Sequence, residues 1–138
     1  MFGDPLLSLG LWSVPVVVHW WARRRRPPKC WRLTGLALGL VVAPASLGLY
    51  ALYYLSPWTA PLGIVGLLLV GFHGWPGNDL AIKVGLVEAR TVVQGVEHLY
   101  IALLNAPIWS ILYGVVGWAI DAARSRRSAR VAATEGRP

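Results

Sequence analysis

The feature that most constrains this chain is a long stretch without any charged side chain. No Asp, Glu, Lys or Arg occurs between Arg32 and Asp79, and the residues from Leu33 to Trp75 are almost all apolar. A core helix or strand of a soluble protein does not need so long an apolar stretch, whereas a helix needs about 20 apolar residues to cross about 30 Å of hydrocarbon. The stretch therefore predicts that this part of the chain lies in a lipid bilayer.

The composition of the whole chain agrees with a membrane environment. Of its 138 residues, 56% are hydrophobic and 14% are charged, whereas soluble domains carry about 25% charged residues. We therefore expect an all-α integral membrane protein that forms one membrane domain over residues 1–138. It should contain three to four transmembrane helices and one amphipathic helix at the membrane interface.

Four segments are apolar enough to be considered as membrane helices. The first covers residues 5–22 and is followed by arginines, the reverse of a secretory signal peptide, in which positive charge precedes the apolar segment. The second, 33–55, is about 35 Å long as a helix, and the last covers 98–120. Residues 60–74 are few for a full span, so they predict a short transmembrane helix or a re-entrant helix.

Residues 79–97 have a different pattern. Five polar or charged residues share one face of a helix: Asp79, Lys83, Arg90, Gln94 and Glu97. This pattern predicts an amphipathic helix at the interface, beginning after a chain break at 74–79. The alternation of apolar residues from Leu80 to Leu86 also fits a strand, which leaves a second interpretation open.

Two blocks of basic residues adjoin the predicted spans. The first is the predicted loop 23–32, and the second opens a tail, 121–138, that we expect to be disordered. The residues expected to contact anionic lipid headgroups are Arg23, Arg24, Arg25, Arg26, Arg124, Arg126 and Arg127. Because each block adjoins a hydrophobic span, we expect no nucleic-acid partner.

The basic blocks also constrain the topology. The positive-inside rule predicts a multi-pass protein of the cell (plasma) membrane with the loop 23–32 in the cytoplasm. If both blocks are cytoplasmic, an even number of crossings must separate them, but three segments lie between them: 33–55, 60–74 and 98–120. We favour an element at 60–74 that does not cross, and four full spans remain the alternative.

Two groups of residues are candidates for helix packing. Gly35, Gly39 and Ala43 form a ridge of small residues at four-residue spacing, which lets another helix approach closely in lipid. Asn105 lies within the last span beside Pro107, and its amide should satisfy a polar group inside the membrane, such as a carbonyl freed by that proline.

Candidates for chemistry are few. The sequence has no phosphate-binding, dinucleotide-binding, zinc-protease or nucleophile-elbow motif. Cys30 is the only cysteine, which excludes an intramolecular disulfide. We therefore expect no catalytic, cofactor or metal site. The alternative is a site for acid–base chemistry or metal binding at His73, Glu97 and His98. Asp121 is expected to form an ion pair with Arg124 at the membrane rim.

These observations favour a non-catalytic membrane protein, an accessory or structural component that packs as a homo-oligomer or within a larger membrane complex. A small oligomeric carrier or channel component, with a path near Pro44 and Asn105, is the alternative, because broken helices at mid-depth are typical of transport sites.

Overall fold

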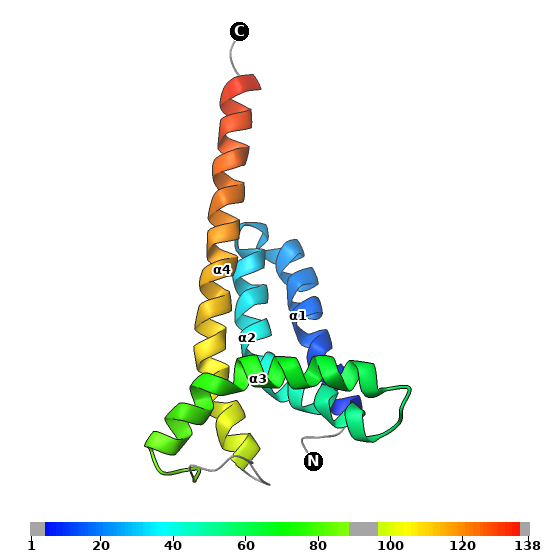
Figure 1. Cartoon of the computed structure of the whole chain (residues 1–138). Helices are drawn as coiled ribbons and strands as arrows, with labels where there is room; N and C mark the ends of the chain where they lie inside the picture. The colour runs from blue at the N-terminus through cyan, green and yellow to red at the C-terminus, as the bar shows by residue number, and fades with distance from the viewer. Residues whose placement is uncertain (1–4, 89–96, 136–138) are drawn as a thin grey trace.

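The computed structural model describes residues 5–88 and 97–135, and these residues form helices joined by short turns (Figure 1). The elements are α1 (Pro5–Arg25), η1 (Pro27–Lys29), α2 (Cys30–Ala51), η2 (Leu52–Tyr54), α3 (Ala60–Lys83) and α4 (Glu97–Glu135). Among the residues that the structure describes, three segments are long and apolar enough to cross a membrane: Pro27–Tyr54, Ala60–Lys83 and Tyr100–Thr134. The predicted class, an all-α multi-pass membrane protein, is confirmed.

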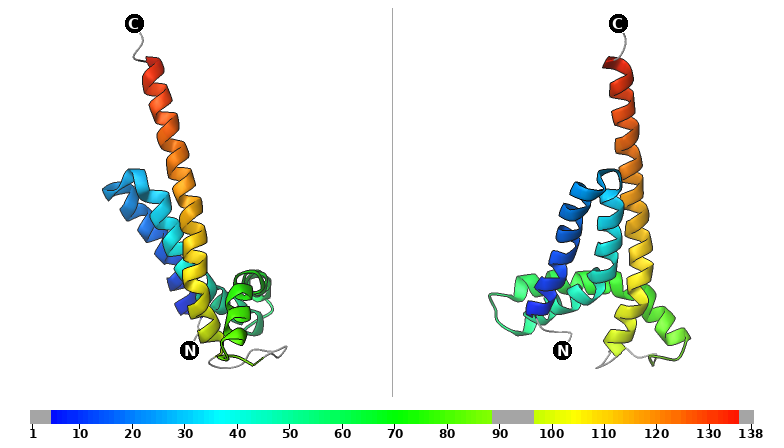
Figure 2. Two further views of the ribbon diagram at one scale, coloured as in Figure 1. Left: turned by 90° about the vertical axis from the view of Figure 1, so that its left-hand side faces the viewer. Right: turned by 180° about the vertical axis from the view of Figure 1, so that it is seen from behind.

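Two antiparallel helices, α2 and α4, form the centre of the molecule and share its most extensive contact. α1 packs along α2 and also runs antiparallel to it. α3 has a different direction: it lies crosswise to α1 and α4, at the end of the bundle remote from the turn between α1 and α2, as Figure 2 shows. The last part of α2 bends and runs alongside α3, where Gly63 and Gly66 meet its backbone. The bundle therefore has one end made by that turn and one end covered by α3.

Glycines bring α2 and α4 together. A Cβ added to Gly35 would collide with the backbone of Tyr113, and one added to Gly39 would collide with the backbone of Ser110. On α4, Gly117 comes equally close to the first turn of α2. Because lipid gives helices no hydrophobic reason to associate, such close packing is a main source of attraction between them.

The connection between α1 and α2 is shorter than the predicted loop 23–32. α1 forms where a helix was predicted over 5–22, and it continues to Arg25, while α2 already begins at Cys30. Only Arg26 and the turn η1 lie between them. Two prolines open η1, a position where their missing backbone donor is tolerated. The predicted loop is therefore wrong over most of its length.

The predicted span 33–55 corresponds to α2 and η2, whereas the predicted break at 74–79 is wrong. α3 continues through Pro76 to Lys83, with a bend that Figure 1 shows clearly. The chain turns just after Lys83 at Gly85, whose φ of 76° is one that residues with a side chain rarely adopt. The backbone N–H groups of Gly85 and Leu86 donate to the carbonyls of Ile82 and Ala81, which closes the helix end.

This continuation also corrects the predicted amphipathic helix 79–97. Its first residues belong to the end of α3, residues 84–88 form a turn, and Glu97 begins α4. Residues 89–96 lie outside the described residues, so the middle of the predicted helix is not described.

The predicted disordered tail 121–138 is wrong over its described part. α4, predicted over 98–120, continues to Glu135, and residues 136–138 lie outside the description. From Asp121 to Glu135 the sequence has no Gly or Pro and is rich in Ala and Arg, which are strong helix formers. With 39 residues, α4 is about 58 Å long, which exceeds the hydrocarbon thickness of about 30 Å.

Candidate functional site

The bend of α3 is held by two side chains of α4. Pro76 cannot donate a backbone hydrogen bond, and its ring pushes the preceding turn open. In a regular helix the N–H of Gly77 would donate to the carbonyl of His73, but here both groups bond to side chains of α4. The N–H of Gly77 donates to Asn105 Oδ1 at 2.7 Å, and Trp109 Nε1 donates to the carbonyl of His73 at 2.8 Å. α3 therefore remains a helix at Pro76 with α4 as its partner.

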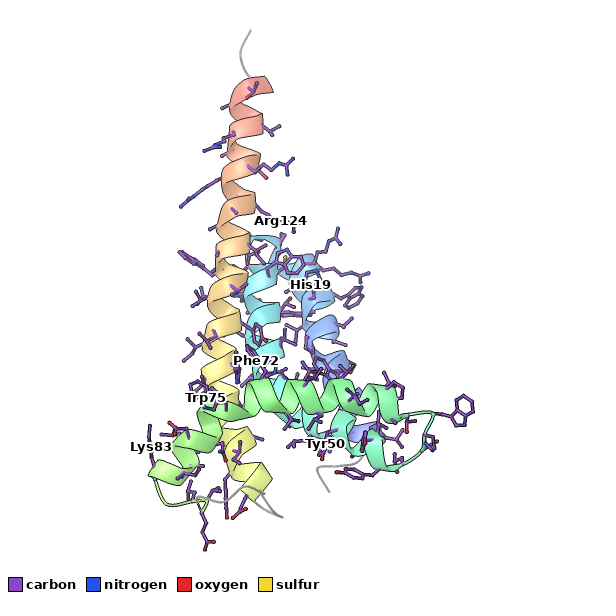
Figure 3. The ribbon with its side chains drawn as sticks, in the orientation of Figure 1. His19, Tyr50, Phe72, Trp75, Lys83 and Arg124 are labelled. Carbon is purple, nitrogen blue, oxygen red and sulfur yellow. The ribbon has the colours of Figure 1, made fainter. Side chains whose placement is uncertain are left out.

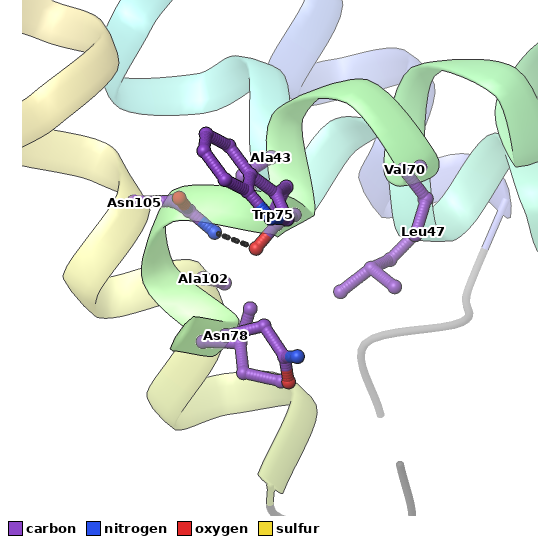
Figure 4. A pocket seen from close by; sticks show the side chains of 10 residues that line it. Ala43, Leu47, Val70, Trp75, Asn78, Ala102 and Asn105 are labelled. Atoms are coloured by element: carbon purple, nitrogen blue, oxygen red, sulfur yellow. Dashed lines mark hydrogen bonds between the residues drawn. The ribbon is translucent and has the colours of Figure 1, made fainter. Parts of the chain in front are cut away.

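Asn105 is the centre of this contact. It is completely buried, and its Nδ2 also donates to the carbonyl of Gly74 at 3.1 Å, as the dashed line in Figure 4 shows. The sequence indicated that Asn105 would satisfy a backbone group freed by a proline of its own helix. Its partners lie instead around Pro76 of α3, because the two helices cross at this point.

His73, a candidate for acid–base chemistry or metal binding, is part of the same contact. It is 3% exposed, and its Nδ1 lies 2.9 Å from the carbonyl of Leu69, which can only accept, so Nδ1 carries the proton. In the neutral ring, Nε2 then accepts from the hydroxyl of Tyr113, which lies 2.7 Å away. Both ring nitrogens of His73 are engaged in helix packing.

The candidate site also included Glu97 and His98. The side chain of His98 lies outside the described residues. Within 5–88 and 97–135, no three His, Cys, Asp or Glu side chains gather where they could hold a metal ion.

Asp121 joins α4 to the start of α2 at the opposite end of the bundle. Its two carboxylate oxygens accept from the backbone N–H groups of Trp31 at 3.3 Å and Arg32 at 2.9 Å. These are free donors of the first helical turn, and the helix dipole favours a negative charge there. The expected ion pair with Arg124 is wrong, because the carboxylate is 7% exposed and serves as a cap on α2.

The two basic blocks meet at this end. The guanidinium of Arg124 lies over the ring of Trp31 at 5.5 Å, and that of Arg24 lies over Trp20 at 3.8 Å. Figure 3 shows Arg124 beside the turn between α1 and α2. All of the arginines expected to contact headgroups are exposed at this basic end of the molecule: Arg23, Arg24, Arg25, Arg26, Arg124, Arg126 and Arg127.

A cavity of about 290 Å³ lies beside the α3 bend. It is lined by Ala43 and Leu47 of α2, by Val70, Gly71, Gly74, Trp75 and Asn78 of α3, and by Ile101, Ala102 and Asn105 of α4. Figure 4 shows Leu47, Val70, Trp75 and Asn78 around it. The Oδ1 atom of Asn78 is buried and has no hydrogen-bond partner among the described residues.

The ridge predicted from Gly35, Gly39 and Ala43 faces α4 of the same chain, and Ala43 reaches the cavity. Sequence reasoning missed the partner surface on α4. Ser110, Gly114 and Gly117 are the small residues on that surface, and the four-residue spacing of the first two is a signal that could have found it. The roles of Trp109 and Asp121 have no such local signal.

Comparison with protein-family models, with curated proteins and with solved structures finds no match for this chain. Its function is therefore inferred from the arrangement of its own residues.

Proposed function

We propose that this chain is a non-catalytic accessory or structural component of a membrane complex, in which packed apolar helices hold an arginine-rich helix at the membrane surface. The observation that carries the proposal is the last part of α4. Every residue from Ala123 to Thr134 is exposed, and this segment extends beyond α1 and α2 (Figures 1 and 2). Its arginines are Arg124, Arg126, Arg127 and Arg130.

The position of this projecting helix is fixed by the bundle. The Asp121 cap lies immediately before it and joins α4 to the first turn of α2. The glycine contacts below the cap hold the two helices together over several turns. An arginine-rich helix of about 12 residues, or about 18 Å, is therefore presented from a fixed point.

The polar groups inside the bundle support a packing role. His73 and Asn105 bind α3 to α4 or to its own preceding turn, and Asp121 binds α4 to α2. Each of these side chains is engaged with a neighbouring helix, which is how polar residues stabilise helix association in membranes.

The same proposal includes a topology. The basic end faces the cytoplasm of the cell membrane and contacts anionic headgroups, since both basic blocks lie there. α2 and α4 are the two crossings between the blocks, and α3 lies along the opposite interface. This arrangement satisfies the requirement for an even number of crossings, and it is supported by the crosswise direction of α3.

The test compares complexes extracted from native membranes in a mild detergent and separated on native gels. We expect the wild-type chain to migrate in a complex well above the mass of its 15.1 kDa monomer. Glutamine at Arg124, Arg126, Arg127 and Arg130 should release the monomer. The matched control carries glutamine at Arg23, Arg24, Arg25 and Arg26, which removes the same charge from the same end.

The control should retain the complex, because it leaves the projecting helix intact. Migration of the wild-type chain as a monomer would contradict the proposal. Equal losses in both variants would show that net charge, rather than the projecting helix, is responsible.

The alternative, a small oligomeric carrier or channel component, is favoured by one observation: the cavity contains Asn105 and also Ala43, which precedes Pro44. Its test is the flux of potassium, protons and glycerol in proteoliposomes. Gly74→Leu should block a path through this cavity, since no atom lies within 4 Å of a Cβ at that position. Absence of flux in the wild-type protein would exclude this function for these three solutes.

A further inference from the structure

We propose that the tip of α4, residues 127–134, binds an acidic amphipathic segment of a protein partner on the water side of the lipid headgroups. The residues that bind it are Arg127, Arg130 and Val131. This inference rests on the proposed accessory function and names the class of partner that the projecting helix receives. It follows from the height of these residues above the membrane, from the charges around them and from the helix face that they share.

The tip of α4 stands beyond the lipid headgroups. Trp118 is 58% exposed on α4, and indole rings prefer the level of the headgroups. Arg130 follows twelve residues later, which places it about 18 Å further along the helix axis. The headgroup layer is only about 5–8 Å thick on each side of the hydrocarbon. Even an arginine side chain that extends back by about 6 Å leaves the guanidinium of Arg130 in water.

The arginines of the basic end therefore differ in what they can reach. The guanidinium of Arg124 lies over the ring of Trp31 at 5.5 Å, which keeps it near the level of the headgroups. A tilt of about 20° would lower the height of Arg130 by less than a tenth, so it does not bring that residue down to the lipid. Anionic lipids can neutralise the lower part of the basic end but not its tip.

The arginines of the projecting helix also repel one another. Arg124, Arg127 and Arg130 follow at three-residue spacing. Arg126 stands four residues before Arg130, and like charges at these spacings destabilise a helix. Among the side chains that the structure describes, no carboxylate forms an ion pair with any of them. The carboxylate of Asp121 is already bonded to the first turn of α2. Carboxylates of a partner would supply the missing opposite charge.

Three residues of the tip share one face of the helix. At 100° per residue, Arg127 lies between Arg130 and Val131, and the three fall within about 100° of one another. Val131 is 49% exposed at a height that acyl chains do not reach. The opposite face of the projecting helix carries small uncharged residues: Ser125, Ser128, Ala129 and Ala132. The tip therefore has one distinct binding face, with an apolar side chain beside two arginines.

The chemistry of this face selects the class of partner. A guanidinium group binds a carboxylate through two parallel hydrogen bonds, which add to the attraction of opposite charges. Val131 gains from an apolar side chain that removes it from water. A protein segment that places Asp or Glu beside Leu or Val supplies both contacts, whereas the backbone of a nucleic acid supplies only anionic phosphates.

The experiment uses the full chain in phosphatidylcholine nanodiscs and a fluorescein-labelled peptide that carries glutamates and leucines at helical spacing. A second peptide has glutamine in place of every glutamate. Fluorescence anisotropy should show saturable binding of the acidic peptide only. Arg127→Gln with Arg130→Gln should weaken binding about tenfold, and Val131→Ser should weaken it about threefold. Unsaturable binding, or equal binding of the glutamine peptide, would overturn the proposal.

The matched control is Arg25→Gln with Arg26→Gln, which removes the same charge from the same end of the molecule. It should change the affinity less than about twofold, because the charges lie far from the tip and are screened by salt. Equal weakening by the two pairs of substitutions would show that net charge, rather than the face at the tip, binds the peptide.

Two further measurements separate a protein partner from other polyanions. In nanodiscs that contain phosphatidylglycerol, a spin label on Ala129→Cys in a Cys30→Ser chain should stay accessible to an aqueous nickel chelate, and the peptide should still bind. Shielding of the label or loss of binding would assign the tip to lipid headgroups and overturn the proposal. Single-stranded DNA of equal charge should displace the labelled peptide less well than the unlabelled acidic peptide does, and equal displacement would overturn it too.

These outcomes are distinct from those of the native-gel test. A wild-type chain that migrates as a monomer would refute the accessory function. A chain that stays in its complex but does not bind the acidic peptide would refute only the class of partner assigned to the tip of α4.

Discussion

Replacing Asn105 with leucine tests whether α4 stabilises the bend of α3. Leucine has the same branching and the same number of side-chain heavy atoms as asparagine, and it removes the hydrogen bonds to Gly77 N–H and to the carbonyl of Gly74. Hydrogen bonds between membrane helices contribute about 0.6 kcal/mol on average and up to about 1.7 kcal/mol. Two such bonds give about 1–3 kcal/mol, and a buried backbone N–H left without a partner adds to the loss.

We therefore expect Asn105→Leu to lower the free energy of unfolding by about 2 kcal/mol. The assay is unfolding of the purified protein by SDS in maltoside micelles, followed by far-ultraviolet circular dichroism. The matched control is Leu103→Ala, two residues away on α4 but 60% exposed, which should change stability by less than about 0.5 kcal/mol.

A double-mutant cycle with Pro76→Ala makes the test specific to the bend. Alanine at this position restores the backbone donor, so the N–H of Gly77 can return to the carbonyl of His73 within α3. In that background Asn105→Leu should cost at least about 1 kcal/mol less than in the wild type. Additive effects, or a loss no larger than that of Leu103→Ala, would refute the reasoning.

Three further perturbations follow from the packing. Asp121→Ala should lower stability by about 1–2 kcal/mol because it uncaps α2, measured in the same SDS titration. An equal effect of Asp79→Ala, which removes only an exposed ion pair with Lys83, would contradict the capping role. Gly39→Val should prevent the native contact of α2 with α4, whereas Gly10→Val should be tolerated. The measurement is the fraction of monodisperse protein in size-exclusion chromatography. A wild-type fraction for Gly39→Val would refute the close approach of the two helices. In a Cys30→Ser protein, single cysteines at Lys29 and Ser128 should react with an impermeant maleimide from one side of the membrane and a cysteine at Trp58 from the other. Opposite sides for Lys29 and Ser128 would show that the two basic blocks do not share a face.

Much of the candidate site depends on contacts that local patterns do not contain. The sequence indicated that Asn105 satisfies a polar group, but its partners lie 28 and 31 residues away along the chain. Trp109 and Asp121 act on His73 and on the start of α2 across similar or longer separations. Hydropathy and helical periodicity describe neighbours along one helix, so they carry no information about such pairs.

The sequence by itself determined the solvent and the class of structure. The charge-free segment from Leu33 to Asn78 is too apolar for water, and backbone groups in lipid must bond within a helix, which leads to an all-helical membrane protein. Tertiary structure alone decided that α3 continues through Pro76 and lies across the bundle, because the backbone groups exposed by that proline are satisfied only where Asn105 and Trp109 meet them. It also placed the two basic blocks at one end, since the carboxylate of Asp121 finds its donors in the first turn of α2.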